Sequence, residues 1–311
     1  MRPVLVLGAT GFLGSHVTEA LARSENAPEW VGVARYPPPR RDSAGVYRSV
    51  DLVASTAEDY ERLLADVRPS AVINCAGVTT GNQASLQANN IGIVRKLVSA
   101  MTRHGEASLV QFGSAAEYGP QPNNDPVAES TVAQPSSPYG ITKLEGTRVA
   151  TAAMEDERVQ GTVLRVFNPV GARAPESSLA GRAARAMRLA MTTRQPSITL
   201  GSLEAQRDFV AADDVGTAAA LAVQATNLPS LLNVGRGVAT SSAALITLLE
   251  DVAGFDGELL ESDPGSPRSS WVPRQRADIT LLRTSLGWVP STPLARAVAA
   301  LWESTAVGVC S

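Results

Sequence analysis

Three glycines stand three residues apart near the start of the chain, between a short apolar run and a stretch with helical spacing of apolar residues. They are Gly8, Gly11 and Gly14 in the segment VLVLGATGFLGSHVTEAL. In a strand–turn–helix unit the first such glycine permits the tight turn, the second lets the backbone approach a pyrophosphate, and the third lets the helix pack closely on the strand. The segment therefore predicts a turn that can bind a dinucleotide at a helix N-terminus. The alternative is a turn without a ligand.

Short apolar runs alternate with helical patterns through the first half of the chain. We expect strands at residues 4–7, 30–34, 71–74, 109–112 and 162–166, and helices at residues 11–23, 56–66, 83–103 and 138–154. Alternating units of this length are typical of α/β proteins in which helices cover both faces of a parallel sheet. Together with the glycine turn, the pattern predicts a Rossmann-type, doubly wound parallel sheet.

The regular alternation stops after residue 166, where prolines become frequent and a Ser/Gly/Pro-rich stretch follows at residues 262–273. A helical pattern at 211–224 and a strand pattern at 231–234 predict that the chain returns to the sheet. We therefore expect a dinucleotide-binding domain formed by residues 1–166 with about 209–236. A smaller C-terminal substrate lobe would be formed by about 167–208 with 237–311.

Composition narrows the class of protein. The 311 residues carry a formal net charge of -3, with two cysteines, Cys75 and Cys310, and two lysines, Lys96 and Lys143. This balance lacks the basic surface that binds nucleic acid or an anionic membrane, and no apolar stretch reaches the roughly 18 residues of a membrane span. We expect a cytoplasmic protein in a reducing compartment. Any lysine that the chemistry requires is one of the two.

The end of the second predicted strand bears on the choice of cofactor. A site that prefers NAD usually has an acidic residue here, which accepts a hydrogen bond from the ribose 2′-hydroxyl. The segment WVGVARY has no carboxylate and offers Arg35, whose guanidinium suits a 2′-phosphate. The sequence therefore favours NADP, with NAD as the second choice. The alternative for Arg35 is a solvated surface residue.

Three residues farther along the chain can support proton transfer at an oxygen atom. Ser114 follows a predicted strand, and Tyr139 and Lys143 lie four residues apart in SPYGITKLEG, where Ser136 or Ser137 can cap a helix. Residues four apart share one face of a helix, so the phenol and the ammonium would project together. The ammonium would lower the phenol pKa from about 10, which makes the tyrosine a proton donor and acceptor near neutral pH.

These motifs together resemble the extended short-chain dehydrogenase/reductase family, whose members act on nucleotide sugars. The resemblance covers nearly the whole chain and rests on GATGFLG at 8–14, Asp51-Leu52, INCAG at 73–77, Asn90, GSAAEYG at 113–119, YGITK at 139–143 and RVFNPVG at 165–171. It implies a catalytic triad of Ser114, Tyr139 and Lys143. It also implies that the cofactor contacts Gly8, Thr10, Gly11, Phe12, Leu13, Gly14, Arg35, Asp51, Leu52, Cys75, Ala76, Gly77, Asn90, Tyr139, Lys143 and Phe167.

The C-terminal half is similar to the branch of this family that contains GDP-4-keto-6-deoxy-mannose reductases. The similarity rests on GSLEAQRDFVAADDVGTA at 201–218, LNVGRG at 232–237 and the segment 266–294. It implies that Arg207 and Arg268 contact a diphosphate. The alternative for Arg207 is an ion pair with Asp213 or Asp214. The substrate would also contact Ser114, Ala115, Ala116 and Asn168.

Departures from the family pattern limit the chemistry further. In the family's dehydratases an Asp-Glu pair follows the triad hydroxyl, whereas Ala115 and Ala116 stand here, so dehydration lacks its acid and base. We expect Glu117 to face a loop. No group of ligands with metal spacing surrounds His16 or His104, so we expect both histidines to be structural and no metal site.

The resemblance implies NADPH-dependent reduction of the 4-keto group of a nucleotide-diphosphate 4-keto-6-deoxyhexose, linked to GDP or dTDP. One alternative is a nucleotide-sugar 4-epimerase that retains NAD, and another is a reductase of other carbonyl compounds. A third, from a different class, is a dinucleotide-sensing module without turnover. We expect a homodimer and neither a nucleic-acid nor a membrane partner.

Overall fold

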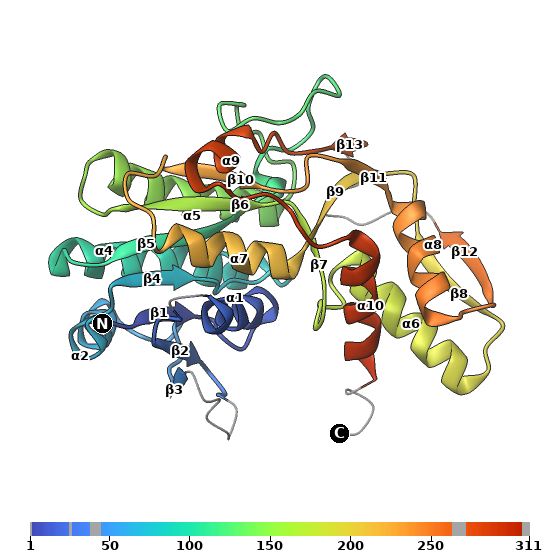
Figure 1. The fold of residues 1–311 in the computed structure, drawn as a ribbon, viewed down its shortest axis with the longest axis horizontal. Coiled ribbons are helices and arrows are strands. Elements are labelled where there is room, and N and C mark those ends of the chain that lie inside the picture. Colours follow the sequence, from blue (N-terminus) through green and yellow to red (C-terminus); the bar gives the residue numbers. More distant parts are fainter. Residues whose placement is uncertain (1, 25–26, 38–44, 263–271, 307–311) are drawn as a thin grey trace.

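A seven-stranded parallel sheet forms the centre of the larger part of the molecule (Figure 1). This computed structural model describes residues 2–24, 27–37, 45–262 and 272–306. The strand order is β10-β6-β5-β4-β1-β2-β3. The strands are β1 (Val4–Leu7), β2 (Trp30–Ala34), β3 (Gly45–Ser49), β4 (Ala71–Asn74), β5 (Ser108–Ser114), β6 (Gly161–Val166) and β10 (Leu231–Val234). The predicted Rossmann-type sheet is therefore confirmed, including the return of the chain at β10.

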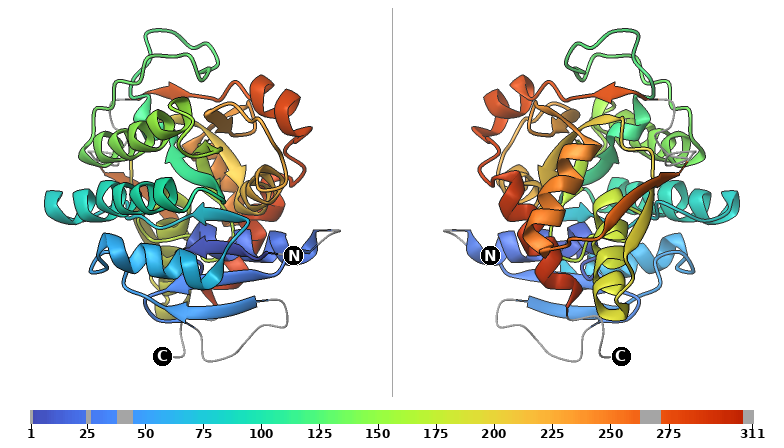
Figure 2. Two further views of the ribbon diagram at one scale, coloured as in Figure 1. Left: turned by 90° about the vertical axis from the view of Figure 1, so that its left-hand side faces the viewer. Right: turned by 90° about the vertical axis from the view of Figure 1, so that its right-hand side faces the viewer.

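Helices cover both faces of this sheet (Figure 2). On one face lie α1 (Phe12–Arg23), α7 (Ala212–Ala222) and α9 (Thr280–Leu286). On the other lie α2 (Ala57–Val67), α4 (Ile93–His104) and α5 (Pro138–Glu155). The short helices α3 (Gln83–Gln87) and η1 (Ala88–Gly92) lead into α4, and η2 (Ala115–Glu117) follows β5.

Strand β1 explains why the sheet has two apolar faces. Its four residues are all buried, and their side chains alternate between the faces because the period of a strand is two. Val4 and Val6 belong to the core beneath α1 and α7, whereas Leu5 and Leu7 belong to the core beneath α2, α4 and α5. A continuous apolar run is thus the pattern expected of a strand covered on both faces.

The smaller lobe has its own apolar core, which contains Met187, Phe209, Leu245 and Val298. Its helices are α6 (Leu179–Thr193), α8 (Ser242–Ala253) and α10 (Leu294–Thr305). Its strands are β7 (Asn168–Val170), β8 (Ser197–Gly201), β9 (Gln206–Ala211), β11 (Ala239–Ser241), β12 (Glu258–Ser262) and β13 (Arg274–Gln275). The exact bounds of the two domains stay a prediction.

Two details differ from the expected elements. Strand β3 was not expected, because it is a short, half-buried edge strand whose place depends on packing against β2. A Cβ at Gly45 would lie 2.4 Å from the Trp30 ring, so glycine is what lets the two strands approach there. The single helix expected at 83–103 is instead α3 and α4 joined by the short π-helix η1.

Along the described part of the chain, no helix is both long and apolar enough to cross a membrane.

Candidate active site

The turn after β1 has no room for a side chain at its first and third glycines. Gly8 has a φ of +73°, and a Cβ there would lie 2.9 Å from the backbone nitrogen of Ala76 in the loop after β4. A Cβ on Gly14 would lie 2.1 Å from the Gly8 carbonyl oxygen. Gly11 caps α1 without a side chain, so no capping group covers the amides of its first turn. This geometry fits a dinucleotide pyrophosphate at the helix N-terminus.

The loop after β4 is held against helix α5 by one amide side chain. Asn90 donates from Nδ2 to the Val78 carbonyl and to Thr142 Oγ1, both at 3.0 Å. Its Oδ1 accepts from the Val78 amide at 3.0 Å. Both amide hydrogens of Asn90 are therefore donated within the protein. These bonds position the loop that carries the predicted cofactor contacts Cys75, Ala76 and Gly77.

At the ends of β2 and β3, Arg35 and Asp51 form an ion pair, with 3.2 Å between Nε and Oδ2. Amide hydrogen bonds from Ala54 and Val53, together with the charge of Arg35, hold the pKa of Asp51 below its usual value despite partial burial. Lys96 Nζ donates to the carbonyls of Leu52, Val53 and Ser55. The loop with the predicted cofactor contacts Asp51 and Leu52 is thus anchored to α4.

Helix α5 carries two residues of the predicted triad and begins at a defined residue. Ser137 Oγ accepts from the Gly140 amide at 3.1 Å, so Ser137 and not Ser136 is the N-cap. Tyr139 follows two residues later and is half-buried, and Lys143 is buried one turn beyond it. The cap sets the start of the helix and hence the direction in which both side chains project.

Strand β5 brings Ser114 to the start of this helix. A Cβ at Gly140 would lie 2.5 Å from the Ala116 carbonyl, so α5 touches the turn that follows Ser114. Lys143 Nζ donates to the Phe112 carbonyl at 2.6 Å. Burial lowers the pKa of Lys143, while the charge of Glu117 opposes that effect. The structure therefore gathers Ser114, Tyr139 and Lys143 at the carboxyl end of β5.

Glu117 does not face a loop, which corrects the sequence-based expectation. The turn η2 directs its carboxylate into the interior, where it is fully buried and pairs with Arg165 on β6 at 2.7 Å. A buried carboxylate needs a partner of opposite charge, and Arg165 is far away in sequence. Nothing in the local pattern of GSAAEYG revealed that partner.

The small sheet of the C-terminal lobe reaches the turn after Ser114. Arg207 on β9 is buried, and burial lowers its pKa to about 10. Gln275 on β13 pairs in register with Arg207 and donates from Nε2 to the Ala115 carbonyl at 3.2 Å. Asn168 donates weakly to the Asp208 carbonyl at 3.4 Å. The predicted substrate contacts Ala115, Asn168 and Arg207 therefore lie close together, where β9 and β13 meet the turn after Ser114.

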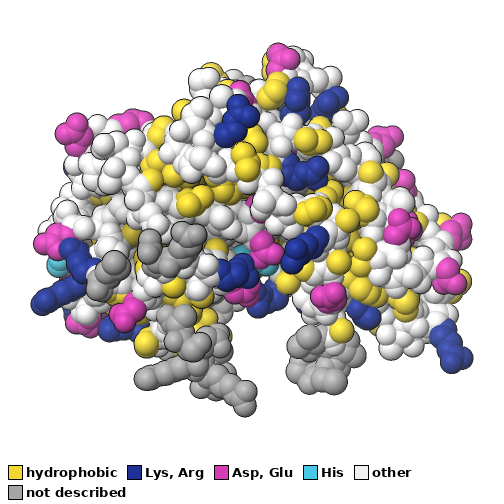
Figure 3. All heavy atoms as spheres, in the orientation of Figure 1, with side chains coloured by type: hydrophobic (Ala, Val, Ile, Leu, Met, Phe, Trp, Pro, Cys, Tyr) yellow, Lys and Arg dark blue, Asp and Glu magenta, His cyan; other side chains and the backbone are white. Residues whose placement is uncertain are grey.

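Two arginines beside this sheet were missed in the sequence. The Nε atoms of Arg274 and Arg276 are buried, and neither has a hydrogen-bond partner among the described residues. In Figure 3, several Lys or Arg side chains are exposed in the upper part of the molecule, where Figure 1 labels β13. The Arg-Gln-Arg spacing around Gln275 was the available signal. The predicted contact Arg268 lies outside the described residues.

Both acidic residues suggested as partners of Arg207 have other partners. Asp214 accepts hydrogen bonds from Ser291 and Thr292. Asp213 contacts His16, with 2.8 Å between Oδ1 and Nδ1, and lies 3.6 Å from Arg23. These contacts connect the start of α7 to α1 and to the loop before α10.

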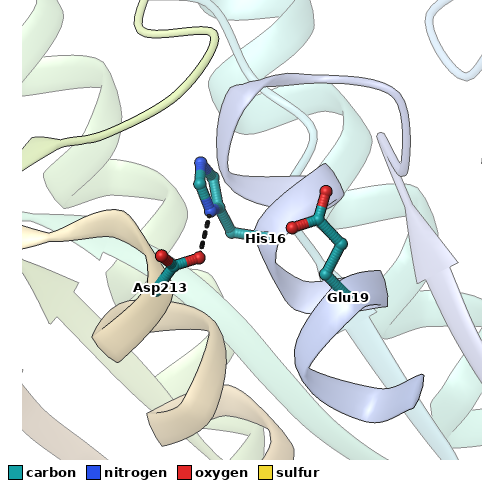
Figure 4. A group of neighbouring side chains, drawn as sticks. All are labelled: His16, Glu19 and Asp213. Carbon is teal, nitrogen blue, oxygen red and sulfur yellow. Dashed lines mark hydrogen bonds and ion pairs between the residues drawn. The ribbon is translucent and has the colours of Figure 1, made fainter. Parts of the chain in front are cut away.

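His16, Glu19 and Asp213 lie close enough together to suggest a cation site (Figure 4). The second ring nitrogen of His16 is 3.0 Å from the Ala172 carbonyl. Glu19 forms an ion pair with Arg173. The negative charges are therefore balanced by protein side chains, and the group joins α1, α7 and the loop after β7.

Comparison with known proteins identifies the family of this chain. Residues 4–235 match the model of the NAD dependent epimerase/dehydratase family. A dTDP-6-deoxy-L-talose 4-dehydrogenase (NAD(P)(+)) from Kitasatospora kifunensis is 36% identical over 97% of this chain and 96% of its own length. A GDP-6-deoxy-D-mannose reductase from Pseudomonas aeruginosa is 26% identical over 97% of each chain. The structure of RMD from Pseudomonas aeruginosa complexed with NADPH superposes with a TM-score of 0.83, at 23% identity, over 99% of this chain and 100% of that one.

Proposed function

The chain belongs to the NAD dependent epimerase/dehydratase family, and we propose that it reduces the 4-keto group of a nucleotide-diphosphate 4-keto-6-deoxyhexose with NADPH. The observation that carries this proposal is the gathering of Ser114, Tyr139 and Lys143 at the end of β5, with alanine at positions 115 and 116. The relative named as a 6-deoxy-talose 4-dehydrogenase supports it, because the reverse of that reaction is a 4-keto reduction.

The cofactor would lie along the carboxyl edge of the sheet. The turn with Gly8, Gly11 and Gly14 would hold its pyrophosphate, and Arg35, at the end of β2, would meet a 2′-phosphate. Tyr139 and Lys143 would lie beside the nicotinamide ribose. When bound, NADPH supplies the hydride that the carbonyl carbon accepts.

Side chains of the protein supply the proton that the carbonyl oxygen accepts. Tyr139 donates its phenolic proton to the carbonyl oxygen as negative charge develops there, and Ser114 donates a hydrogen bond to the same oxygen. The ammonium of Lys143 stabilises the phenolate that remains on Tyr139. The bond from Lys143 to the Phe112 carbonyl keeps the ammonium at the end of β5 throughout.

The substrate's diphosphate requires local cations, because the whole chain is slightly acidic. Arg207 would supply a guanidinium group that matches phosphate oxygens, and the arginines that flank Gln275 add positive charge to the same small sheet. The bond from Gln275 to Ala115 connects this sheet to the turn after Ser114. This arrangement supports a nucleotide-diphosphate sugar over a free carbonyl compound as the substrate.

A 4-epimerase that retains NAD is the second candidate, since the family includes epimerases and the same triad serves both reactions. Purified protein would be incubated with GDP- and dTDP-linked 4-keto-6-deoxyhexoses and NADPH, while absorbance at 340 nm and the sugar product are followed. A second sample would be incubated with 4-hydroxy nucleotide sugars without added cofactor. We expect stoichiometric NADPH oxidation with a 4-hydroxy product. Tightly retained NAD, with interconversion of 4-epimers and no net oxidation, would instead identify an epimerase. Dinucleotide binding without any turnover would favour a sensing module.

A further inference from the structure

The fully buried carboxylate of Glu117 lies between the strand and the helix that carry the predicted triad. Glu117 Oε1 accepts from the Ser114 amide at 2.7 Å and from Thr147 Oγ1 at 3.0 Å. Ser114 ends strand β5, and Thr147 lies on α5 one turn beyond Lys143. One oxygen atom therefore bonds both the strand that carries Ser114 and the helix that carries Tyr139 and Lys143.

The second oxygen of this carboxylate holds an opposite charge. Glu117 Oε2 accepts from Arg165 Nε at 2.7 Å, and both side chains are almost completely buried. The guanidinium of Arg165 lies over the Tyr118 ring, 4.5 Å from its centroid, and Tyr118 donates to Asn233 on β10. The carboxylate is thus oriented from β6 and is not free to turn toward solvent.

The backbone leaves room for this pair at one position. A Cβ on Gly113 would lie 2.9 Å from Glu117 Oε1 and 3.1 Å from Arg165 Cγ. Glycine immediately before Ser114 therefore lets the ion pair approach the strand.

We propose that Glu117 is a positioning residue for catalysis, which fixes Ser114 relative to the Tyr139–Lys143 face of α5 and supplies a negative charge near the Lys143 ammonium. This inference rests on the proposed function, because it assumes that these three side chains carry the reaction. Glu117 itself makes no contact with the reacting atoms.

The charges around Lys143 are consistent with that role. Lys143 donates to the Phe112 carbonyl, and a Cβ on the next residue, Gly113, would lie 2.9 Å from Glu117 Oε1, so both charges lie beside the same stretch of β5. The charge of Glu117 raises the pKa of Lys143 against the larger lowering that burial causes. Tyr139 lies on the same face of the helix, and Arg165 is the cation on the far side of Glu117. Removal of the Glu117 charge would leave the positive charge of Arg165 without its negative partner. The protonated form of Lys143 would then be less stable, and the pKa of Lys143 would fall.

The sequence makes this testable without a substrate, since Lys96 and Lys143 are its only lysines. A protein labelled with 13C in lysine side chains would give two Cε signals, which Lys143→Met assigns, and each can be titrated by NMR. In Glu117→Gln, which keeps an oxygen acceptor for the Ser114 amide, we expect the pKa of Lys143 to fall by at least about half a pH unit. The pKa of Lys96 should not change.

Asp214→Asn is the matched control, because Asp214 is also a buried carboxylate but bonds to Ser291 and Thr292 instead of the triad. We expect it to leave Lys143 unchanged. An unchanged Lys143 pKa in folded Glu117→Gln would overturn the electrostatic part of the proposal.

Kinetics test the positioning part. Glu117→Leu removes the acceptor, and we expect kcat to fall about a hundredfold while KM and the Kd for NADPH stay within about twofold. Glu117→Gln should restore much of kcat, which a role in folding alone does not predict. If Glu117→Leu does not fold, Thr147→Val replaces it, with an expected loss in kcat of about threefold to tenfold.

Wild-type kcat in Glu117→Leu, or in Thr147→Val where that variant is needed, would refute positioning. If wild type reduces no 4-keto nucleotide sugar, the proposed function fails. The lysine titration still decides whether Glu117 controls Lys143.

Discussion

Lys143 Nζ donates a 2.6 Å hydrogen bond to the Phe112 carbonyl, so the helix that carries Tyr139 is tied to the strand that ends in Ser114. A lysine buried in this way keeps its charge only where oxygen atoms and acidic groups face it. Here the carbonyl and Glu117 serve that purpose. The ammonium is thus held in one place, one helical turn beyond Tyr139, which we propose as the proton donor.

Tyr139→Phe should reduce kcat by about a hundred- to ten-thousandfold, because the variant lacks the phenolic proton that the carbonyl oxygen would accept. The substitution keeps the aromatic ring. The Kd for NADPH, measured by calorimetry, should stay within about twofold, since the glycine turn is untouched. Retention of more than about a tenth of the wild-type rate would mean that another group is the acid.

Arg35→Ala should weaken NADPH binding by about tenfold and NADH binding much less, since a charge-assisted bond to the 2′-phosphate is lost. The loss is smaller than for a buried pair because the Arg35 side chain is 55% exposed and already pairs with Asp51. Arg48→Ala is the control, because Arg48 lies on neighbouring β3 and pairs with Asp66. Equal losses for both cofactors would show that Arg35 does not meet the phosphate.

Arg207→Ala should raise the KM for the nucleotide sugar by about tenfold to a hundredfold at unchanged NADPH affinity, as expected for the loss of a charged hydrogen bond to phosphate. We expect the same direction for Arg274→Ala, Arg276→Ala and Arg268→Ala. Arg283→Ala, on the exposed side of α9, serves as the control.

Inhibition by nucleotide diphosphates checks the same region independently. GDP or dTDP should compete with the sugar substrate and not with NADPH. Normal KM values in all four variants, together with no inhibition by GDP, dTDP or UDP, would exclude a nucleotide-diphosphate substrate.

Tyr60→Phe should lower the free energy of unfolding at pH 7 by about 0.5–1.5 kcal/mol, because the buried hydroxyl donates to the Leu52 carbonyl. Burial raises the pKa of Tyr60 far above its usual value. The unfolded chain therefore loses this proton first, and wild type should lose stability as the pH rises above about 10. The difference in the free energy of unfolding between wild type and Tyr60→Phe, measured by urea titration, should therefore become smaller above about pH 10. A constant difference from pH 7 to pH 11 would contradict the burial argument.

The sequence by itself determined the features that depend on neighbours along the chain. The glycine turn, the alternation of strands and helices and the four-residue spacing of Tyr139 and Lys143 are of this kind. Backbone sterics and the periods of strand and helix act over a few residues, so they can be read without the fold. The family resemblance rests on the same local motifs.

Tertiary structure alone decided which distant groups meet. The inward turn of Glu117 depends on Arg165, which lies 48 residues away, and the place of β3 depends on its contact with Trp30. Likewise, Gln275 comes beside Arg207 only because β13 pairs with β9. Desolvated charges and edge strands are stabilised by partners that the sheet brings together, and no local pattern specifies those partners.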